Sequence, residues 1–196
     1  MEKKVIAVTG GIGSGKSTVC RLLEKKGFRV VDCDALSRRA AERSDTLEEI
    51  VRVFGERFVD GGKLNRRALA LEVFSDSEKT DKLNKIFHKR IFGLLEEEIA
   101  KQNGTVFVEI QLLPDDKIRL FDGVWLVTAS EETRIKRAMA RDDRSEEQVR
   151  SIIQRQNAFC DKQRENVEIL VNDGDAAALE AAIDALLVKE SVSAGS

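Results

Sequence analysis

The stretch that decides the fold lies near the start of the chain, where residues 5–18 read V-I-A-V-T-G-G-I-G-S-G-K-S-T. The short apolar run over 4–9, closed by glycines, is typical of a buried central strand of a parallel sheet. The turn that follows matches G-x-x-x-x-G-K-[ST], and a helix is expected over 15–26. This order of strand, glycine-rich turn and helix predicts a phosphate-binding loop (P-loop).

The residues of this turn have separate tasks in holding ATP. Glycines let the backbone aim its N–H groups at phosphate oxygens, and the helix N-terminus adds partial positive charge. Lys16 would place a cation on the β- and γ-phosphates, and the Ser17 hydroxyl would ligate the Mg²⁺ that bridges them. The expected nucleotide-binding residues are Gly11, Ile12, Gly13, Ser14, Gly15, Lys16, Ser17 and Thr18.

Further apolar runs, separated by helical stretches, predict strands at 28–31, 105–110, 124–128 and 167–171. Alternation of this kind predicts an α/β fold with a doubly wound, five-stranded parallel sheet. We expect one domain built around the P-loop over 1–196, with its core at about 1–34, 104–134 and 165–190.

The helical segment 35–103 is too long for a simple crossover between two strands. It predicts a helical acceptor-binding insertion at about 60–103, and a lid is expected at about 138–163. A stripe formed by Leu83, Phe87, Ile91 and Leu94 should pack the last helix of the insertion on a core. The small, polar tail over 189–196 is expected to be frayed.

Charge and composition narrow the class of protein. The chain has 33 Lys and Arg against 35 Asp and Glu, a net charge of -2, which provides no basic patch for nucleic acid or a membrane surface. No apolar run is long enough for a signal peptide or a membrane span, so we expect a cytoplasmic protein. Cys20, Cys33 and Cys160 stand apart and are expected to be reduced structural thiols.

An acidic pair, Asp32 and Asp34, closes the second predicted strand. Ligands of doubly wound sheets bind beyond the carboxyl ends of the strands, where Asp34 could accept a proton from an acceptor hydroxyl. The alternative is that Asp34 caps the following helix. No N-K-x-D tetrapeptide for reading guanine is present, which favours a kinase over a GTPase.

Basic side chains suggest how charge on a phosphoryl group could be neutralised. Arg134, Arg137 and Arg141 share one stripe of a predicted helix. We expect Arg141, beside the loop 142–145, to act in phosphoryl transfer, and Arg134 to lie on a solvated face.

His88 is the only histidine, and Arg90 follows two residues later. Two interpretations stay open: the histidine is structural, or the pair binds a phosphate of the acceptor.

Several motifs together resemble the dephospho-coenzyme A kinase family. T-G-G-I-G-S-G-K-S-T and V-V-D-C-D-A-L resemble its opening signature, and F-G-E-R-F-V-D-G-G-K-L-N-R-R-A-L, M-A-R-D-D-R-S-E-E, I-I-Q-R-Q and L-V-N-D-G-D follow in its order. The resemblance implies a nucleoside-monophosphate-kinase-like fold and phosphorylation of the ribose 3′-hydroxyl of dephospho-coenzyme A by MgATP. It implies catalytic roles for Asp34, Lys16 and Arg141. Separately, we expect a monomer or a small homo-oligomer.

The third predicted strand departs from the family pattern. Residues 109–115 read E-I-Q-L-L-P-D, whereas the family usually has aspartate, isoleucine or valine, proline, two leucines, an aromatic residue and glutamate. Glu109 keeps the charge with one more methylene, and we expect it to contact the acceptor or the surroundings of Mg²⁺. Gln111 and Pro114 change the shape of the segment, which leaves open a kinase for another acceptor or a silent nucleotide-binding regulatory module.

A smaller departure follows His88, where Lys89 replaces the usual proline. Without that proline, the helix is expected to continue.

Overall fold

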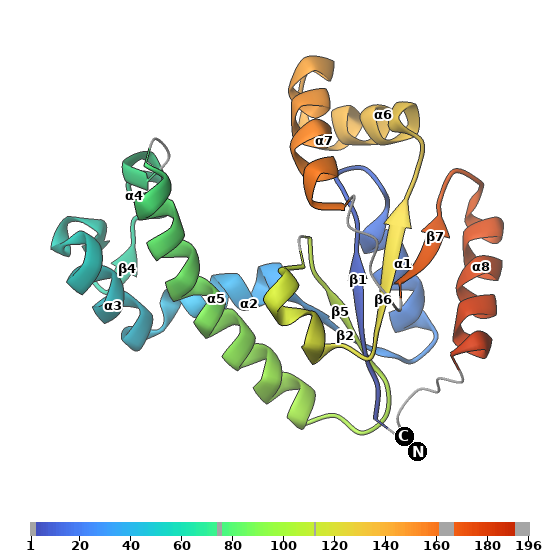
Figure 1. Cartoon of the computed structure of the whole chain (residues 1–196), viewed down its shortest axis with the longest axis horizontal. Coiled ribbons are helices and arrows are strands. Elements are labelled where there is room, and N and C mark those ends of the chain that lie inside the picture. The colour runs from blue at the N-terminus through green and yellow to red at the C-terminus, as the bar shows by residue number, and fades with distance from the viewer. Residues whose placement is uncertain (1–2, 74–75, 112, 161–166, 191–196) are drawn as a thin grey trace. The chain divides into compact units, whose positions relative to one another are not determined.

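The structure is a computed structural model that describes residues 3–73, 76–111, 113–160 and 167–190, the side chains of 115 and 157–160 aside. The chain divides into two compact units (Figure 1). The sheet unit comprises Met1–Val31 and Gln102–Ser196, and the helical unit comprises Asp32–Lys101.

The sheet unit is built on five strands in the order β2-β5-β1-β6-β7 (Figure 1). The strands are β1 (Val5–Thr9), β2 (Arg29–Asp32), β5 (Val106–Glu109), β6 (Gly123–Thr128) and β7 (Val167–Val171). In the parallel ladders of β1, Val8 lies beside Glu109 on one side and Trp125 on the other. The predicted five-stranded parallel sheet of an α/β fold is confirmed.

The central strand is buried because apolar side chains cover it. Ile6 and Val8 are fully buried and join a cluster with Phe107 and Trp125. Two helices, α1 (Lys16–Lys25) and α8 (Ala176–Lys189), pack into the same cluster through Val19, Leu23, Leu179 and Ile183. The sheet unit also contains η2 (Asp115–Leu120), α6 (Glu131–Asp142) and α7 (Glu146–Cys160).

The helical unit has a core of its own. Its helices are α2 (Cys33–Glu42), α3 (Ser44–Phe54), η1 (Glu56–Phe58), α4 (Arg66–Val73) and α5 (Ser77–Ala100). Leu83 and Phe87 of the predicted stripe pack against a buried cluster made of Ile50, Phe58, Leu69, Val73 and Ile86. The helix α5 runs on through Lys89, as the absence of a proline there predicts.

A small hairpin in the helical unit was not predicted from the sequence. Strands β3 (Val59–Asp60) and β4 (Lys63–Leu64) pair antiparallel around Gly61 and Gly62. The two glycines have φ values of 54° and 75°, which glycine adopts without strain and which a tight two-residue hairpin turn requires. Strands of two residues are too short to show alternation.

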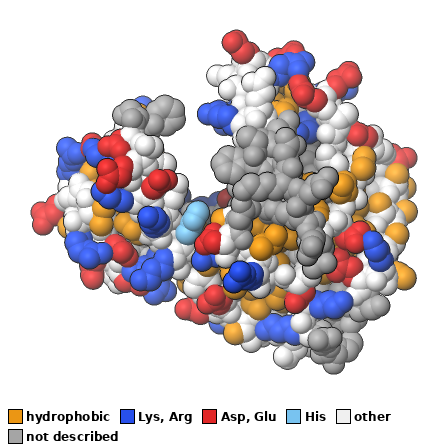
Figure 2. All heavy atoms as spheres, in the orientation of Figure 1, with side chains coloured by type: hydrophobic (Ala, Val, Ile, Leu, Met, Phe, Trp, Pro, Cys, Tyr) orange, Lys and Arg blue, Asp and Glu red, His pale blue; other side chains and the backbone are white. Residues whose placement is uncertain are grey.

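Parts of several predicted segments lie outside the described residues. They are 1–2, 112 and 165–166 of the core, 74–75 of the insertion, 161–163 of the lid and 191–196 of the tail. The helix α8 ends at Lys189. Within the described ranges, no helix combines the length and the apolar character that crossing a membrane requires. On the face of the molecule drawn in Figure 2, Lys and Arg side chains are interspersed with Asp and Glu.

Candidate active site

The P-loop is the turn between β1 and α1. Gly13 and Gly15 have φ values of 73° and 96°, so the loop depends on glycine at both positions. Gly15 is also the N-cap of α1, whose first turn carries no acidic side chain. No hydrogen bond within the described residues uses the N–H groups of Gly13 or Gly15. These donors and the helix N-terminus form a cradle suited to an anion.

Lys16 is the cation of this cradle. It is the first residue of α1, and its Nζ donates a 2.7 Å hydrogen bond to the carbonyl oxygen of Gly10. The same bond keeps the ammonium group close to the P-loop, where the phosphates of a nucleotide would bind. Ser17 is the next residue, in the first turn of α1.

Buried polar side chains hold the back of the loop, and sequence reasoning gave them no role. Gln156 Oε1 accepts a 2.7 Å hydrogen bond from Ile12 N–H, and Asn172 Nδ2 donates one of 2.8 Å to the carbonyl oxygen of Ser14. Both side chains are buried. Their motifs, I-I-Q-R-Q and L-V-N-D-G-D, were visible in the sequence, but periodicity alone says nothing of a contact across more than 140 positions.

The prediction that Arg134 lies on a solvated helix face is wrong. Its Nε donates a 3.0 Å hydrogen bond to the carbonyl oxygen of Ile12, and its side chain lies against Gly11. The reason is tertiary, because the P-loop packs across the first turns of α6. Arg137 of the same stripe donates from Nη1 to the carbonyl oxygen of Asn172 at 2.9 Å.

Glu109 ends β5 beside Val8, next to the strand that leads into the P-loop. It is half-buried and accepts a hydrogen bond from the thiol of Cys20 on α1. Burial raises the pKa of the Cys20 thiol, and the Glu109 carboxylate raises it further, so the thiol stays protonated. Cys20 and Cys33 are both buried and form no disulfide within the described residues, whereas the side chain of Cys160 lies outside them. That the thiols are reduced stays a prediction.

Asp34 follows β2 by two residues, in the first turn of α2. The alternative that it caps this helix is wrong, because Asp32 is the N-cap and its Oδ1 accepts a 2.7 Å hydrogen bond from the Asp34 N–H. The Asp34 side chain is exposed, and within the described residues its carboxylate takes part in no hydrogen bond or ion pair. An exposed carboxylate of this kind is available to accept a proton.

Arg141 lies at the end of α6. Its Nε and Nη2 donate to the two carboxylate oxygens of Asp142 at 2.7 and 2.8 Å, a bidentate ion pair. The hydrogen bond from Arg141 lowers the pKa of Asp142. In this arrangement the guanidinium is exposed, and its expected role in phosphoryl transfer stays a prediction.

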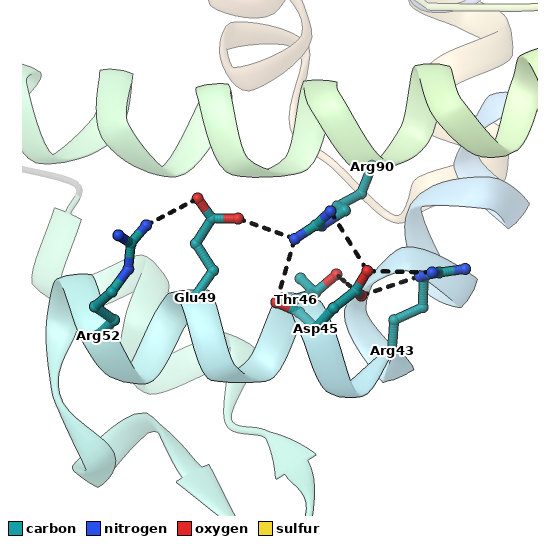
Figure 3. Close-up of polar contacts among 6 residues, drawn as sticks. All are labelled: Arg43, Asp45, Thr46, Glu49, Arg52 and Arg90. Atoms are coloured by element: carbon teal, nitrogen blue, oxygen red, sulfur yellow. Dashed lines mark hydrogen bonds and ion pairs between the residues drawn. The ribbon is translucent and has the colours of Figure 1, made fainter.

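His88 and Arg90, the two candidates on α5 for binding a phosphate of the acceptor, have different surroundings in the structure. His88 is exposed and meets Phe92 edge to face, with ring centroids 6.2 Å apart. Arg90 instead turns toward α3 (Figure 3), where it donates to the carbonyl oxygen of Asp45 at 3.3 Å and to Glu49 Oε2 at 3.1 Å. An ion pair of 3.4 Å joins it to the Asp45 carboxylate. Arg90 therefore links α5 to α3.

Replacing Arg90 by methionine is expected to lower the free energy of unfolding by about 1 to 3 kcal/mol, because charged hydrogen-bond acceptors on α3 lose their donor. Arg52→Met is the matched control: Arg52 pairs with the same Glu49, but its side chain is 74% exposed against 21% for Arg90. The control should cost less than about 1 kcal/mol. Urea denaturation measures both. Equal losses in the two variants would contradict a structural role for Arg90.

The same network predicts a dependence of stability on pH. A hydrogen bond from Arg43 lowers the pKa of Asp45, and the charge of Arg90 adds to the effect. A carboxylate with a depressed folded pKa stabilises fully above its unfolded pKa of about 3.9, and this stabilisation is lost as pH falls through the folded pKa. Thermal unfolding between pH 7 and pH 2 should therefore show a shallower acid decline for Asp45→Asn than for the wild type. Asp60→Asn, at an exposed position of β3, should keep the wild-type decline.

Two cavities of the helical unit share Leu64 and Arg66. One, of about 510 Å³, has mainly apolar walls: Ser37, Leu64, Arg66, Leu69, Ala70, Val73, Thr80, Leu83 and Phe87. The other, of about 550 Å³, is bordered by charged side chains: Arg38, Glu42, Lys63 and Arg66, with Ala41, Gly62 and Leu64. Together they could accept a molecule with an apolar arm and an anionic part.

Comparison with known proteins agrees with the site. The sequence model of the dephospho-CoA kinase family matches residues 4–178. The dephospho-CoA kinase of Thermus thermophilus is 42% identical over 188 residues, 94% of this chain and 91% of the relative. That of Staphylococcus aureus is 37% identical over 193 residues, covering 95% and 93% of the two chains.

Solved structures show the same fold. A crystal structure of a Thermus thermophilus protein superposes with a TM-score of 0.79 at 38% identity, covering 96% of this chain and 98% of the other. Dephospho-CoA kinase from Campylobacter jejuni follows at 0.71 and 24% identity, covering 97% and 98%. Shikimate kinase from Acinetobacter baumannii superposes with a TM-score of 0.52 at 17% identity, covering 96% of this chain and 93% of the other, and this likeness shows the fold alone. On its sequence, its P-loop and its sheet, this chain belongs to the dephospho-CoA kinase family.

Proposed function

We propose that this chain transfers the γ-phosphoryl group of ATP to the ribose 3′-hydroxyl of dephospho-coenzyme A and so forms coenzyme A. The observation that carries the proposal is family membership over residues 4–178 together with an intact P-loop. The departures from the family pattern at 109–115 do not include Lys16, Ser17 or Asp34.

In the proposed mechanism, the loop amides of Gly13 and Gly15 and the ammonium group of Lys16 bind the phosphates of ATP. Lys16 exchanges its bond to the Gly10 carbonyl for a phosphate oxygen. Asp34 accepts the proton of the acceptor hydroxyl as the new bond forms between that oxygen and the γ-phosphorus. The bond from the γ-phosphorus to the bridging oxygen breaks, and ADP leaves with the electron pair.

The donor set near the P-loop fits Mg²⁺. This ion prefers oxygen ligands and keeps several waters, so it needs no cage made entirely of protein side chains. Within the described residues no group of three or more His, Cys, Asp and Glu side chains gathers, whereas the Ser17 hydroxyl and the Glu109 carboxylate are oxygen donors on adjoining elements. When bound, the ion would neutralise charge on the β- and γ-phosphates. We propose that Ser17 ligates it and that Glu109 acts on its surroundings.

Our proposal includes roles for residues of the lid and, separately, of the helical unit. We propose that Arg141 leaves Asp142 to neutralise charge on the transferring group. The two cavities of the helical unit support binding of the acceptor there, since dephospho-coenzyme A combines an anionic diphosphate with a long, weakly polar arm. His88 is exposed on α5 of the same unit, and we propose that it assists acceptor binding.

Release of ADP from MgATP, measured with dephospho-coenzyme A, adenosine monophosphate and shikimate as separate acceptors, tests the proposal. Stimulation by dephospho-coenzyme A alone is the expected result. Stimulation by another acceptor alone would favour a kinase of different specificity. Tight ATP binding without stimulation by any of the three would favour a silent regulatory module.

A further inference from the structure

Ile12, the third residue of the P-loop, is held by two helices that follow β6. Its N–H donates to Gln156 Oε1 of α7 at 2.7 Å, and its carbonyl oxygen accepts from Arg134 Nε of α6 at 3.0 Å. Its side chain is buried in a cluster with Ile135, Ala138, Val149 and Ile153, two residues from each helix. Both backbone groups and the side chain of one loop residue therefore depend on α6 and α7.

The two helices form a firm support. Arg150 of α7 pairs with Glu131 of α6 and, at 2.8 Å, with Glu146 on its own helix. The two helices also share the buried apolar cluster that contains Ile12. A change in the conformation of the loop therefore acts on two helices, α6 and α7, that are packed together.

The glycines of the loop lie close to other parts of the sheet unit. An added Cβ would lie 2.1 Å from Arg134 Nη2 at Gly11 and 2.2 Å from the Arg134 carbonyl oxygen at Gly13. At Gly15 it would lie 2.0 Å from Asn172 Nδ2. The absence of a side chain at these three positions thus lets Arg134 and Asn172 pack against the loop, in addition to letting a ligand approach it.

We propose that Gln156 is a positioning residue for nucleotide binding, which rests on the binding of ATP proposed above. By accepting the hydrogen bond of the Ile12 N–H, it fixes the peptide that joins Gly11 and Ile12, so that the N–H groups of Gly13 and Gly15 stay available for phosphate. Without this acceptor, a nearly buried N–H group loses its hydrogen bond, and the loop must rearrange to regain one. The rearranged loop would have to be reordered whenever a nucleotide binds.

Coupling of this kind works in both directions. If Gln156 helps α7 to order the P-loop, a bound nucleotide must in turn stabilise α7. The effect should reach the described turns of α7 through one buried hydrogen bond and the cluster around Ile12.

Gln156→Met removes the acceptor while keeping the length of the side chain. Gln154→Met makes the same change two residues away at an exposed position of α7 and is the matched control. The dissociation constant of MgADP, measured by calorimetry on the full chain, should rise at least tenfold for Gln156→Met, which equals about 1.4 kcal/mol. For the control it should stay within about twofold. ADP should slow amide hydrogen exchange in α7 of the wild type, and less so in Gln156→Met.

Gln156→Asn provides a second test if the methionine variant does not fold. Its amide is too short to reach Ile12 but keeps the polarity of the site, and the same loss of affinity is expected. Wild-type affinity for MgADP in a folded variant at position 156 would overturn the inference, even if its melting temperature were lower. A wild-type chain that binds neither ADP nor ATP would overturn the proposed function and, with it, this inference.

Discussion

Asp34→Asn is expected to lower kcat by about 10²- to 10⁴-fold, the range that a positioned general base contributes, while MgATP binding stays within about twofold. Asparagine has the size of aspartate and can orient a hydroxyl, but it does not accept the proton. The Asp34 side chain is exposed in the first turn of α2, and the cap of that helix is Asp32. Its replacement should therefore leave the fold intact. Steady-state ADP release and equilibrium binding of MgATP measure the two quantities.

The control for this prediction is Asp32→Asn, the same chemical change two residues earlier. Asparagine is as good an N-cap as aspartate, so the hydrogen bond to the Asp34 N–H should persist and kcat should change little. A kcat for Asp34→Asn within about threefold of the wild type would remove Asp34 from the mechanism. A matching large loss in both variants would point to the geometry of the turn and not to a base.

The parts of the fold that could be predicted are those with a local physical signature. A parallel strand buried on both faces is a nearly continuous apolar run, which is why the run over 4–9 contains β1, whose residues Val5 to Val8 are buried. The expected strand over 167–171 also coincides with β7, although β7 is an edge strand on which Ile169 and Val171 are exposed. The P-loop was visible because its glycines, its lysine and its hydroxyl must be adjacent in sequence to act together.

The parts that could not be predicted depend on tertiary contacts. Nothing in a helical repeat tells an arginine that packs under a loop from one in solvent, and this is how Arg134 was misassigned. Gln156 reaches Ile12 across 144 positions. Asp34 and Asp32 are both good N-cap residues, and only the observed start of α2 at Cys33 decides between them.

The residues proposed to bind the acceptor could be predicted only in part. Arg90 was a candidate for binding a phosphate on sequence grounds, but a cation on α5 is equally suited to pair with Asp45 and Glu49 of α3, as Figure 3 shows. Which occurs depends on how α3 packs on α5, and hydrophobic periodicity does not specify this. The two cavities of the helical unit likewise arise from side chains of α2, β4, α4 and α5 together.

Lys16→Met is expected to lower kcat/KM for ATP by about 10²- to 10³-fold, the loss typical of removing one preorganised charged donor from a transferring group. Methionine keeps the length and much of the packing of the lysine stem, so the loop and α1 should fold as before. The loss should appear in both nucleotide binding and kcat, because Lys16 contacts the phosphates before the reaction and during it. This distinguishes Lys16 from Asp34, whose replacement should affect kcat alone.

Lys25→Met tests whether the loss comes from the place of the charge or from the net charge of the chain. Lys25 lies in the last turn of the same helix and is exposed, so its replacement should leave kcat/KM within about twofold. If Lys16→Met retained wild-type kcat/KM, the bond from Lys16 to the Gly10 carbonyl would be a purely structural contact, and the phosphates of ATP would have to be neutralised elsewhere. If both variants lost activity equally, the effect would lie in the long-range field of α1 and not in contact with the phosphates.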